Sequence, residues 1–384
     1  MLKKILNKIY YYLPIGFLLK PIILLESNPD YCDNSRGVSD RLIELGYNEK
    51  NKIVWFVQDK DVFKDINIKN VEFVSYSNTK KIRYYSYFAK YIVDCNRFIF
   101  KRNRSQLRIH LTHGTPIKFA GGYCAQCGKL DYVTQISDYF TEVTKELFKV
   151  TDKQVISVGF PRNDILLKKN NCIYYPEIKR KKTICWFPTY RNHKGHSTGK
   201  NIFPYGIPSV NNEKELKELN NALKKEDVLL VIKLHPAEDT SILRKLDLDH
   251  IKLIEDSIFD SDHTTLYHYF RNVDALITDY SSVYYDFMLT KRPIGLAISD
   301  IKEYVKTTRI VFDKFEDGVA GEYIYTFKDL LTFVHNVATD NDISYERRME
   351  KMKIYHKYFD DKSADRIIAI MEKKGLKKWR KNLK

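Results

Sequence analysis

The stretch "HLTHGTPIKF" places a histidine beside a glycine where an apolar run ends. If "LRIHLT" forms a strand, His113, Gly114 and Thr115 fall at its carboxyl end. There Gly114 lets backbone come close to a ligand, and Lys118 brings a positive charge. A single histidine at a strand end is more often a structural hydrogen-bonding residue. The neighbouring residues of "THGTPIK" weaken that interpretation without excluding it.

A second stretch, "VLLVIKLHPAED", repeats this arrangement later in the chain. It predicts a buried strand from Val228 to Leu234 that ends in His235 and Pro236. Lys233 precedes the histidine by two positions, so both side chains lie on the same face of the strand. The stretch therefore predicts a histidine and a lysine together at one strand end.

A third stretch, "DALITDYSSVYYDF", predicts a strand over residues 275–278, a short turn and a helix that begins at Ser281 or Ser282. Asp279 and the serines are residue types that cap helices. The unpaired N–H groups of a helix start also bind phosphate, so capping and a phosphate site both remain open. The motifs "VGFPRND", "FPTYR" and "EYVKTTR" add three candidate cations, Arg162, Arg191 and Arg309.

Zinc is an alternative for the first stretch, because His110, His113, Cys124 and Cys127 are four suitable ligands within 18 residues. Side chains of a strand alternate between its faces, so His110 and His113 could share a metal only if the strand ended between them. We therefore expect no metal site, and we interpret the cysteines as buried or unpaired thiols.

The elements that must position these residues are strands that alternate with helix-like segments. Apolar β-branched runs such as "PIILLES", "KIVWFV", "TICWFP" and "RPIGLA" form two series, which predicts parallel α/β sheets covered on both faces. We expect two doubly wound, Rossmann-like domains that face a central cleft. The expected boundaries are a membrane-contacting segment 1–20, an acceptor domain 21–167, a linker 168–182, a donor domain 183–345, and a C-terminal helix with a basic tail 346–384.

The composition is that of a folded soluble chain with a strong positive charge. Of 384 residues 43% are hydrophobic and 30% are charged, and the net charge of +16 indicates a polyanionic partner. Six scattered cysteines do not suggest a disulfide framework, so we expect a reducing cytoplasm. RNA-recognition signatures are missing from the sequence, and we expect no nucleic acid among its partners.

Both ends of the chain combine lysines with apolar residues. Leu2, Ile5, Leu6 and Ile9 follow helical spacing opposite lysines, and "EKKGLKKWRKNLK" places seven basic residues around Leu376, Trp379 and Leu383. Prolines and lysines interrupt the first segment before it could cross a bilayer. We therefore expect a peripheral (monotopic) protein held by an anionic membrane surface, although a solvated tail is the simpler alternative.

In their order, these motifs resemble the CDP-glycerol glycerophosphotransferase family of teichoic-acid and capsule synthesis. The resemblance rests on "LLESNPDYCDNSRGVSDRL", "THGTPIK", "VGFPRND", "FPTYR", "KLHP", "ITDYSSVYYDF" and "EYVKTTRIVFD", from about Leu24 to Asp313. It implies a GT-B arrangement, association with the cytoplasmic face of the cell membrane, and transfer of a polyol phosphate from a CDP-activated donor to a lipid-linked or glycan acceptor. It also implies that His113 and His235 are essential.

The resemblance places the nucleotide diphosphate at Asp279, Ser281 and Ser282, with the later arginine at Arg309. Phosphoryl transfer depends mainly on positioning and charge stabilisation. We therefore expect His113 to take the proton of the acceptor hydroxyl and His235, with Lys233, to stabilise the β-phosphate or the departing CMP. No cofactor is expected. The remaining phosphate or acceptor candidates are Gly114, Thr115, Lys118, Arg162 and Arg191.

Three other functions stay open at this point. A ribitol phosphate donor fits the same motifs, and a GT-B glycosyltransferase would use a similar histidine and phosphate-binding helix. The release of CMP rather than a nucleoside diphosphate separates phosphotransfer from sugar transfer. A binding module or membrane scaffold without chemistry would need neither histidine at a strand end.

Overall fold

The computed structural model describes residues 9–119, 129–168, 181–189, 203–235, 240–255 and 264–378. The chain divides into two compact units, and each is described here by itself. Unit 1 contains residues 1–115, 121–167 and 356–384, and unit 2 contains residues 116–120 and 168–355. The expected 346–384 segment is thus divided between the units, and most of the expected linker, residues 169–180, lies outside the described residues.

Unit 1 is built on a seven-stranded parallel sheet with the strand order β3-β2-β1-β4-β5-β6-β7. The chain reverses direction across the sheet between β1 and β4, which is the switch point where open α/β sheets bind ligands. The strands are β1 (Lys20–Glu26), β2 (Lys52–Val57), β3 (Val71–Ser75), β4 (Ala89–Asp94), β5 (Leu107–His110), β6 (Tyr132–Gln135) and β7 (Val155–Ser157).

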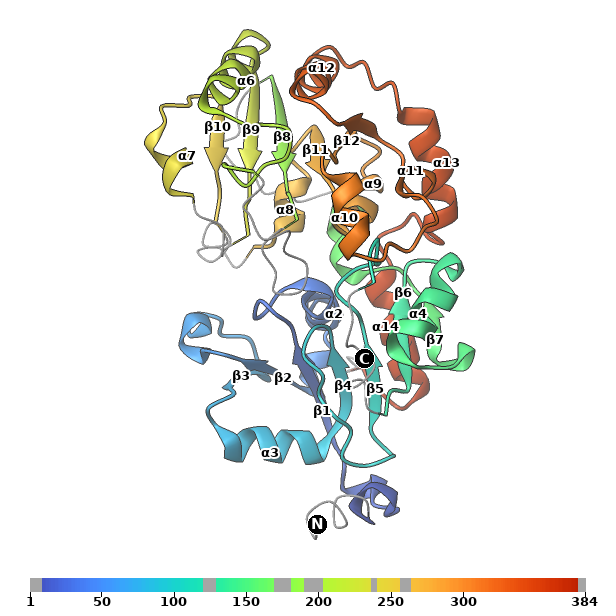
Figure 1. The fold of residues 1–384 in the computed structure, drawn as a ribbon. Coiled ribbons are helices and arrows are strands. Elements are labelled where there is room, and N and C mark those ends of the chain that lie inside the picture. The colour runs from blue at the N-terminus through green and yellow to red at the C-terminus, as the bar shows by residue number, and fades with distance from the viewer. Residues whose placement is uncertain are drawn as a thin grey trace, which may run out of the picture. The chain divides into compact units, whose positions relative to one another are not determined.

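Helices cover both faces of this sheet (Figure 1). The core on one face includes residues of α2 and α14, and the core on the other face includes residues of α3. The helices of unit 1 are α2 (Asp33–Glu44), α3 (Thr79–Phe88), α4 (Thr141–Phe148), α5 (Asp164–Leu167) and α14 (Ser363–Lys373). Short 3-10 turns are η1 (Gly16–Leu18), η2 (Tyr47–Glu49), η3 (Lys60–Phe63), η5 (Asp138–Phe140), η6 (Asp152–Gln154) and η7 (Pro161–Asn163).

Unit 2 contains a six-stranded parallel sheet with the order β10-β9-β8-β11-β12-β13. Counted within the unit this is 3-2-1-4-5-6, the strand order of a dinucleotide-binding Rossmann fold. The strands are β8 (Lys182–Trp186), β9 (Val228–Ile232), β10 (Ile251–Leu253), β11 (Ala275–Thr278), β12 (Ile294–Ala297) and β13 (Glu322–Ile324). The helices are α6 (Glu213–Lys225), α7 (Ser241–Lys245), α8 (Leu266–Phe270), α9 (Val283–Met288), α10 (Ile301–Thr307), α11 (Phe315–Gly318), α12 (Phe327–Ala338) and α13 (Tyr345–Tyr355).

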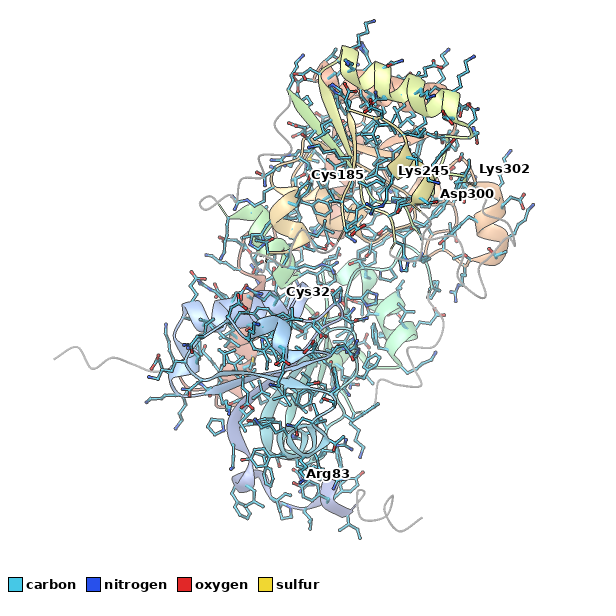
Figure 2. All side chains as sticks on the ribbon, turned by 90° about the vertical axis from the view of Figure 1, so that its left-hand side faces the viewer. Cys32, Arg83, Cys185, Lys245, Asp300 and Lys302 are labelled. Atoms are coloured by element: carbon cyan, nitrogen blue, oxygen red, sulfur yellow. The ribbon has the colours of Figure 1, made fainter. Side chains whose placement is uncertain are left out.

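Side chains fill the space between each sheet and its helices (Figure 2). Cys185, labelled there, is fully buried on β8, and Cys32, Cys95 and Cys185 form no disulfide in the described part of the chain. The prediction of two α/β Rossmann-like units is therefore confirmed. The expected central cleft between the two units stays a prediction.

Candidate active site

Arg162 joins three segments at the carboxyl edge of the unit 1 sheet. Its Nη1 donates to Oδ1 of Asp33 (2.7 Å) and to the carbonyl oxygen of His113 (2.6 Å). Asn34 donates from Nδ2 to the carbonyl oxygen of Thr112 (2.9 Å) and accepts from the backbone N–H of Arg162 (3.2 Å). The start of α2, the turn after β5 and η7 therefore form one hydrogen-bonded network that fixes the backbone of His113.

Three residues of this edge have backbone conformations that side chains disfavour. Tyr31, Asp33 and Thr112 have φ values of 53°, 58° and 53°, in the left-handed region. Such residues cost on the order of 1–3 kcal/mol each and are concentrated at functional sites. Thr112 is β-branched, which makes this conformation especially unfavourable, and it immediately precedes His113. The strained backbone therefore indicates that this turn is kept for the position it gives to His113 and not for its contribution to stability.

His113 is set up to be a neutral imidazole. Its side chain is exposed to solvent, yet the surrounding protein desolvates it, and this lowers its pKa below the ordinary value. The Asp33 carboxylate acts in the opposite direction, whereas the Arg162 guanidinium lowers the pKa further. A histidine that is neutral at neutral pH can accept a proton, as a general base must.

His110 faces away from this site and into a buried ion cluster. Its Nδ1 lies 2.7 Å from Oδ1 of Asp94, while Nη2 of Arg108 donates to Oδ2 of the same carboxylate (2.8 Å). Burial acts to raise the pKa of Asp94, but Arg108 and His110 outweigh it and keep the pKa low. The two histidines of the zinc alternative therefore point in different directions, and Cys124 and Cys127 lie outside the described residues.

Asp279 follows β11 at the switch point of unit 2, but its side chain points inward. It is fully buried, and its carboxylate accepts from the backbone N–H of Thr189 (2.9 Å), the hydroxyl of Thr189 (2.5 Å) and the backbone N–H of Tyr280 (2.6 Å). These bonds tie the segment after β8 to the segment after β11. These contacts give Asp279 a positioning role, and its direct contact with a donor stays a prediction.

Ser281 and Ser282 are partly exposed beside this carboxylate. The helix α9 begins at Val283, one or two residues later than the sequence predicts, and Ser282 is its N-cap without a side-chain capping bond. Ser281 reaches the N–H of Val283 only at 3.5 Å. Simple capping therefore explains these serines poorly, because neither hydroxyl forms a short bond to the helix start.

Lys118 belongs to unit 2 and not to the unit of His113. Residues 117–119 pair with residues 309–311, since the N–H of Phe119 donates to the carbonyl of Arg309 (2.9 Å). Nζ of Lys118 donates to the hydroxyl of Tyr304 (3.1 Å), and the guanidinium of Arg309 lies 3.8 Å from the Phe119 ring centroid. The end of the motif "THGTPIK", at Ile117 and Lys118, is thus a neighbour of the end of "KTTR" within unit 2.

The predicted strand before His235 ends two residues early, at Ile232. Lys233 continues the sheet through its N–H, which donates to the carbonyl of Trp186 (3.0 Å), and His235 is exposed beyond the strand end. The structure therefore puts both side chains at the carboxyl edge of the unit 2 sheet, beside the segment held by Asp279. Pro236 and Arg191 lie outside the described residues.

Sequence reasoning assigned no role to Asp33 and Asn34. Both lie in "YCDNSRG", one of the stretches that carry the family resemblance, but neither follows an apolar run in the way that His113 and His235 do. The available signal was the run of polar residues from the end of β1 into the start of α2, at the switch point of the sheet. Their partners, Thr112 and Arg162, are far away in sequence, so the network itself could not be inferred.

Two Rossmann-type sheets with polar side chains at their carboxyl edges define a two-domain α/β enzyme of the GT-B-like class. Solved structures share this fold. The wall teichoic acid polymerase TagF aligns with a TM-score of 0.71 at 22% identity, over 93% of this chain and 90% of that one. A putative UDP-N-acetylglucosamine 2-epimerase from Listeria monocytogenes aligns with a TM-score of 0.53 at 13% identity, over 92% and 96%.

The chain belongs to the CDP-glycerol:poly(glycerophosphate) glycerophosphotransferase family, whose model matches residues 14–373. The chain is therefore a transferase, and the family predicted from the motifs is confirmed. It is 27% identical to a teichoic acid poly(glycerol phosphate) polymerase of Bacillus spizizenii, over 84% of this chain and 86% of that protein. It is 30% identical to a teichoic acid ribitol-phosphate primase of the same organism, over 58% of this chain and 54% of that protein.

Proposed function

We propose that the protein transfers glycerol phosphate from CDP-glycerol to a hydroxyl of a teichoic-acid-type acceptor. The acceptor oxygen attacks the β-phosphorus, the bond between that phosphorus and the oxygen bridging to CMP breaks, and CMP leaves with the electron pair. His113 takes the hydroxyl proton. Family membership and the name of the Bacillus spizizenii polymerase support this substrate class.

The observation that carries the proposal is the setting of His113. Its backbone is fixed by Arg162, its ring is exposed, and its pKa is lowered by desolvation. His110 differs, because its ring is buried and its Nδ1 lies 2.7 Å from Asp94. An exposed, neutral imidazole on a rigid, strained turn suits a proton acceptor.

Unit 2 supplies the groups for the CDP donor in this proposal. His235 and Lys233 act on the β-phosphate or on the leaving CMP, and Ser281 and Ser282 donate to the diphosphate. Arg309, Gly114, Thr115 and Lys118 remain candidate phosphate or acceptor contacts. Transfer needs no cofactor or metal in this scheme, because side-chain cations carry the charge stabilisation. Activity that survives a metal chelator is the expected result.

In this proposal the protein acts at the cytoplasmic face of the membrane, where a soluble nucleotide donor is available. In the described part of the chain, no helix is long and apolar enough to cross a bilayer. We therefore propose that the protein attaches peripherally to an anionic surface, and that its acceptor is lipid-linked or held in a membrane-associated glycan.

Ribitol phosphate is the second candidate, because the ribitol-phosphate primase is 30% identical to part of the chain. Purified protein should be given CDP-glycerol and CDP-ribitol separately, with a crude membrane acceptor, and CMP release measured. Faster release from CDP-glycerol is expected. Preference for CDP-ribitol would reassign the polyol, and release of a nucleoside diphosphate from a nucleotide sugar would overturn phosphotransfer.

The role of His113 is tested by His113→Ala. Loss of a general base lowers the rate by about 100 to 10,000-fold, while the exposed position predicts an unchanged melting temperature. His335→Ala is the matched control, since His335 is 61% exposed on α12 and makes an ion pair with Glu226 away from the proposed groups. Near-normal turnover in His113→Ala would show that another group takes the proton.

A further inference from the structure

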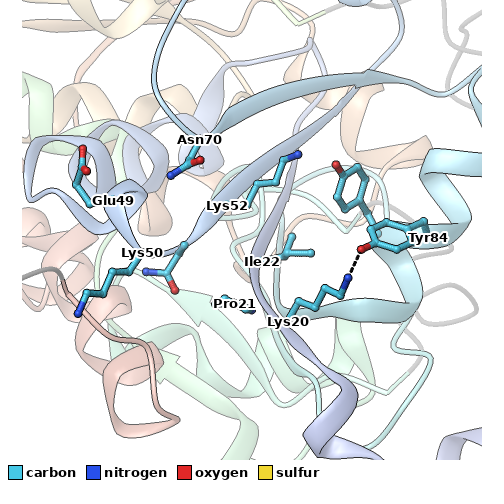
Figure 3. Close-up of a pocket in the computed structure, with 10 residues that line it drawn as sticks. Lys20, Pro21, Ile22, Glu49, Lys50, Lys52, Asn70 and Tyr84 are labelled. Atoms are coloured by element: carbon cyan, nitrogen blue, oxygen red, sulfur yellow. Dashed lines mark hydrogen bonds between the residues drawn. The ribbon is translucent and has the colours of Figure 1, made fainter.

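A pocket of about 330 Å³ opens at the amino edge of the unit 1 sheet, opposite the edge that carries His113 (Figure 3). It lies where β1 and β2 begin, between α3 and the turn after η2. Pro21 and Ile22 supply apolar surface. The polar lining comes from Lys20, Glu49, Lys50, Asn51, Lys52, Asn70, Tyr84 and Tyr85.

Two of the lysines of the pocket are available to an anion. Nζ of Lys20 donates to the hydroxyl of Tyr84 (2.5 Å), and Lys50 is exposed. Within the described ranges neither is paired with a carboxylate. Lys52 does have such a partner, because it binds Glu72, and Glu49 is held by Lys69 (2.6 Å). Lys20 therefore offers an ammonium group beside the hydroxyl of Tyr84, and Lys50 adds a second positive charge at the other end of the pocket (Figure 3).

The residues just before Lys20 form an exposed apolar surface. Residues 9–12 are helical and η1 follows, yet Phe17 is 82% exposed. Exposed large apolar side chains indicate an interaction surface. Where basic residues accompany them, they indicate a surface that binds a membrane. The other exposed apolar residues here are Ile9, Tyr12, Leu13 and Leu18.

The basic C-terminal segment lies at the same edge. Nδ2 of Asn51 donates to the carbonyl of Lys377 (2.9 Å), and Nζ of Lys378 lies 6.0 Å from the centroid of the Tyr47 ring. Asn51 also lines the pocket. Four exposed lysines of this segment therefore join the pocket and the apolar residues on one side of unit 1. They are Lys373, Lys374, Lys377 and Lys378.

We propose that this pocket binds the phosphate-bearing headgroup of an anionic phospholipid. The ammonium group of Lys20 meets the phosphate, the hydroxyl of Tyr84 donates to it, and Pro21 and Ile22 contact the glycerol carbons. Lys50 adds positive charge at the other end of the pocket (Figure 3). The apolar residues before Lys20 lie at the boundary of the acyl chains. This inference rests on the proposed attachment to a membrane and gives that attachment a specific site.

Vesicle co-sedimentation at low salt, with the full chain, tests the pocket. Three vesicles are compared: neutral phosphatidylcholine, the same lipid with phosphatidylglycerol, and the same lipid with cholesterol hemisuccinate at matched surface charge. Wild-type protein should bind the phosphatidylglycerol vesicles most tightly. Lys20→Gln with Lys50→Gln should weaken that binding about 30-fold and remove the preference over hemisuccinate.

Lys214→Gln with Lys225→Gln is the matched control, because both lysines are exposed on α6 of unit 2 and the charge change is the same. It should bind phosphatidylglycerol vesicles like the wild type. Point substitutions are preferred to deletion of the basic tail, since Leu376 is buried in the core of unit 1.

Equal binding by the pocket variant and the control would overturn the proposal, as would equal binding of the wild type to both anionic vesicles. A thermal shift by millimolar inorganic phosphate, lost in the pocket variant while vesicle binding is unchanged, would assign the pocket to a soluble anion and overturn it too. Wild-type protein that binds no anionic vesicle would contradict the membrane attachment itself. None of these outcomes depends on CMP release, so the proposed transfer is judged separately.

Discussion

The chemistry of His113 depends on two neighbours of opposite charge. Arg162 fixes the turn through the carbonyl of His113 and lowers the pKa of the ring, while Asp33 raises that pKa. The two are bonded to each other, so the position of the arginine and the charge balance of the histidine are set by one contact. Arg162 and Asp33 together therefore set the pH above which His113 is neutral.

The acid limb of the pH profile of kcat/KM should report this balance. In the wild type it should lie below the ordinary histidine pKa of about 6.5, since the pKa is lowered and the base stays neutral at lower pH. Arg162→Gln removes a group that lowers the pKa, so the limb should move to higher pH. Asp33→Asn removes a group that raises it, so the limb should move to lower pH.

Arg162→Lys is the control, because it keeps the charge but not the forked geometry. It should leave the limb near its wild-type position even if the rate falls. Shifts in the same direction for Arg162→Gln and Asp33→Asn would show that the limb follows some other group.

The sequence predicts which residues lie at the strand ends but not which of them touch. His113, Lys233 and His235 do lie beyond their strands, because apolar runs and their ends are visible in one dimension. The inward turn of Asp279 and the pairing of Lys118 with Tyr304 depend on contacts between distant segments. Residue types alone carry no information on such contacts.

At the scale of elements, Gly37 decides how closely α2 approaches η7. A Cβ on Gly37 would lie 2.6 Å from the carbonyl carbon and oxygen of Pro161. No other residue type fits without moving the backbone. This close approach brings Asn34, one turn earlier on α2, to the N–H of Arg162.

Gly37→Ala should therefore destabilise the protein by about 1–3 kcal/mol, as overpacking does, and lower the transfer rate. In an open helix the same change would stabilise by about 1 kcal/mol, so the sign of the effect is diagnostic. Chemical denaturation measures it. A more stable Gly37→Ala variant would show that α2 can shift away from Pro161 without loss.

The element predictions succeed where strands are long and apolar. The strand over 275–278 is observed as predicted, and "KIVWFV" forms β2. β6 and β13 were not predicted, because "YVTQ" has one aliphatic residue and "EYI" is a three-residue strand at the sheet edge. Their neighbours in the sheet, rather than their own composition, make them strands.

At the scale of the whole molecule, unit 1 is assembled from separate stretches of chain. α14 packs beside α2, where Arg41 forms an ion pair with Asp365 (2.6 Å), and its apolar face completes the core on that side of the sheet. The amino edge of the same sheet carries the proposed lipid pocket and the carboxyl edge carries His113. The seven residues of β1 span about 20 Å between these edges.

A chain that ends at residue 362 should lose the folded state of unit 1. It lacks the buried Ile367, Ile368 and Met371, each worth about 2–5 kcal/mol, and this sum is comparable to the stability of a domain. Calorimetry should show unit 2 melting without the unit 1 transition. A chain that ends at residue 378 is the control and should melt like the full chain. Equal melting curves for the two would mean that α14 is dispensable.

The position of α14 also bears on how the protein is made. About 320 residues separate the end of α2 from the start of α14, which is roughly 15 to 60 s of synthesis at common elongation rates. During that time the nascent chain carries an uncovered apolar helix face on the unit that emerged first. The ribosome thus finishes unit 2 while unit 1 still lacks α14, so the apolar face of α2 is covered only near the end of synthesis.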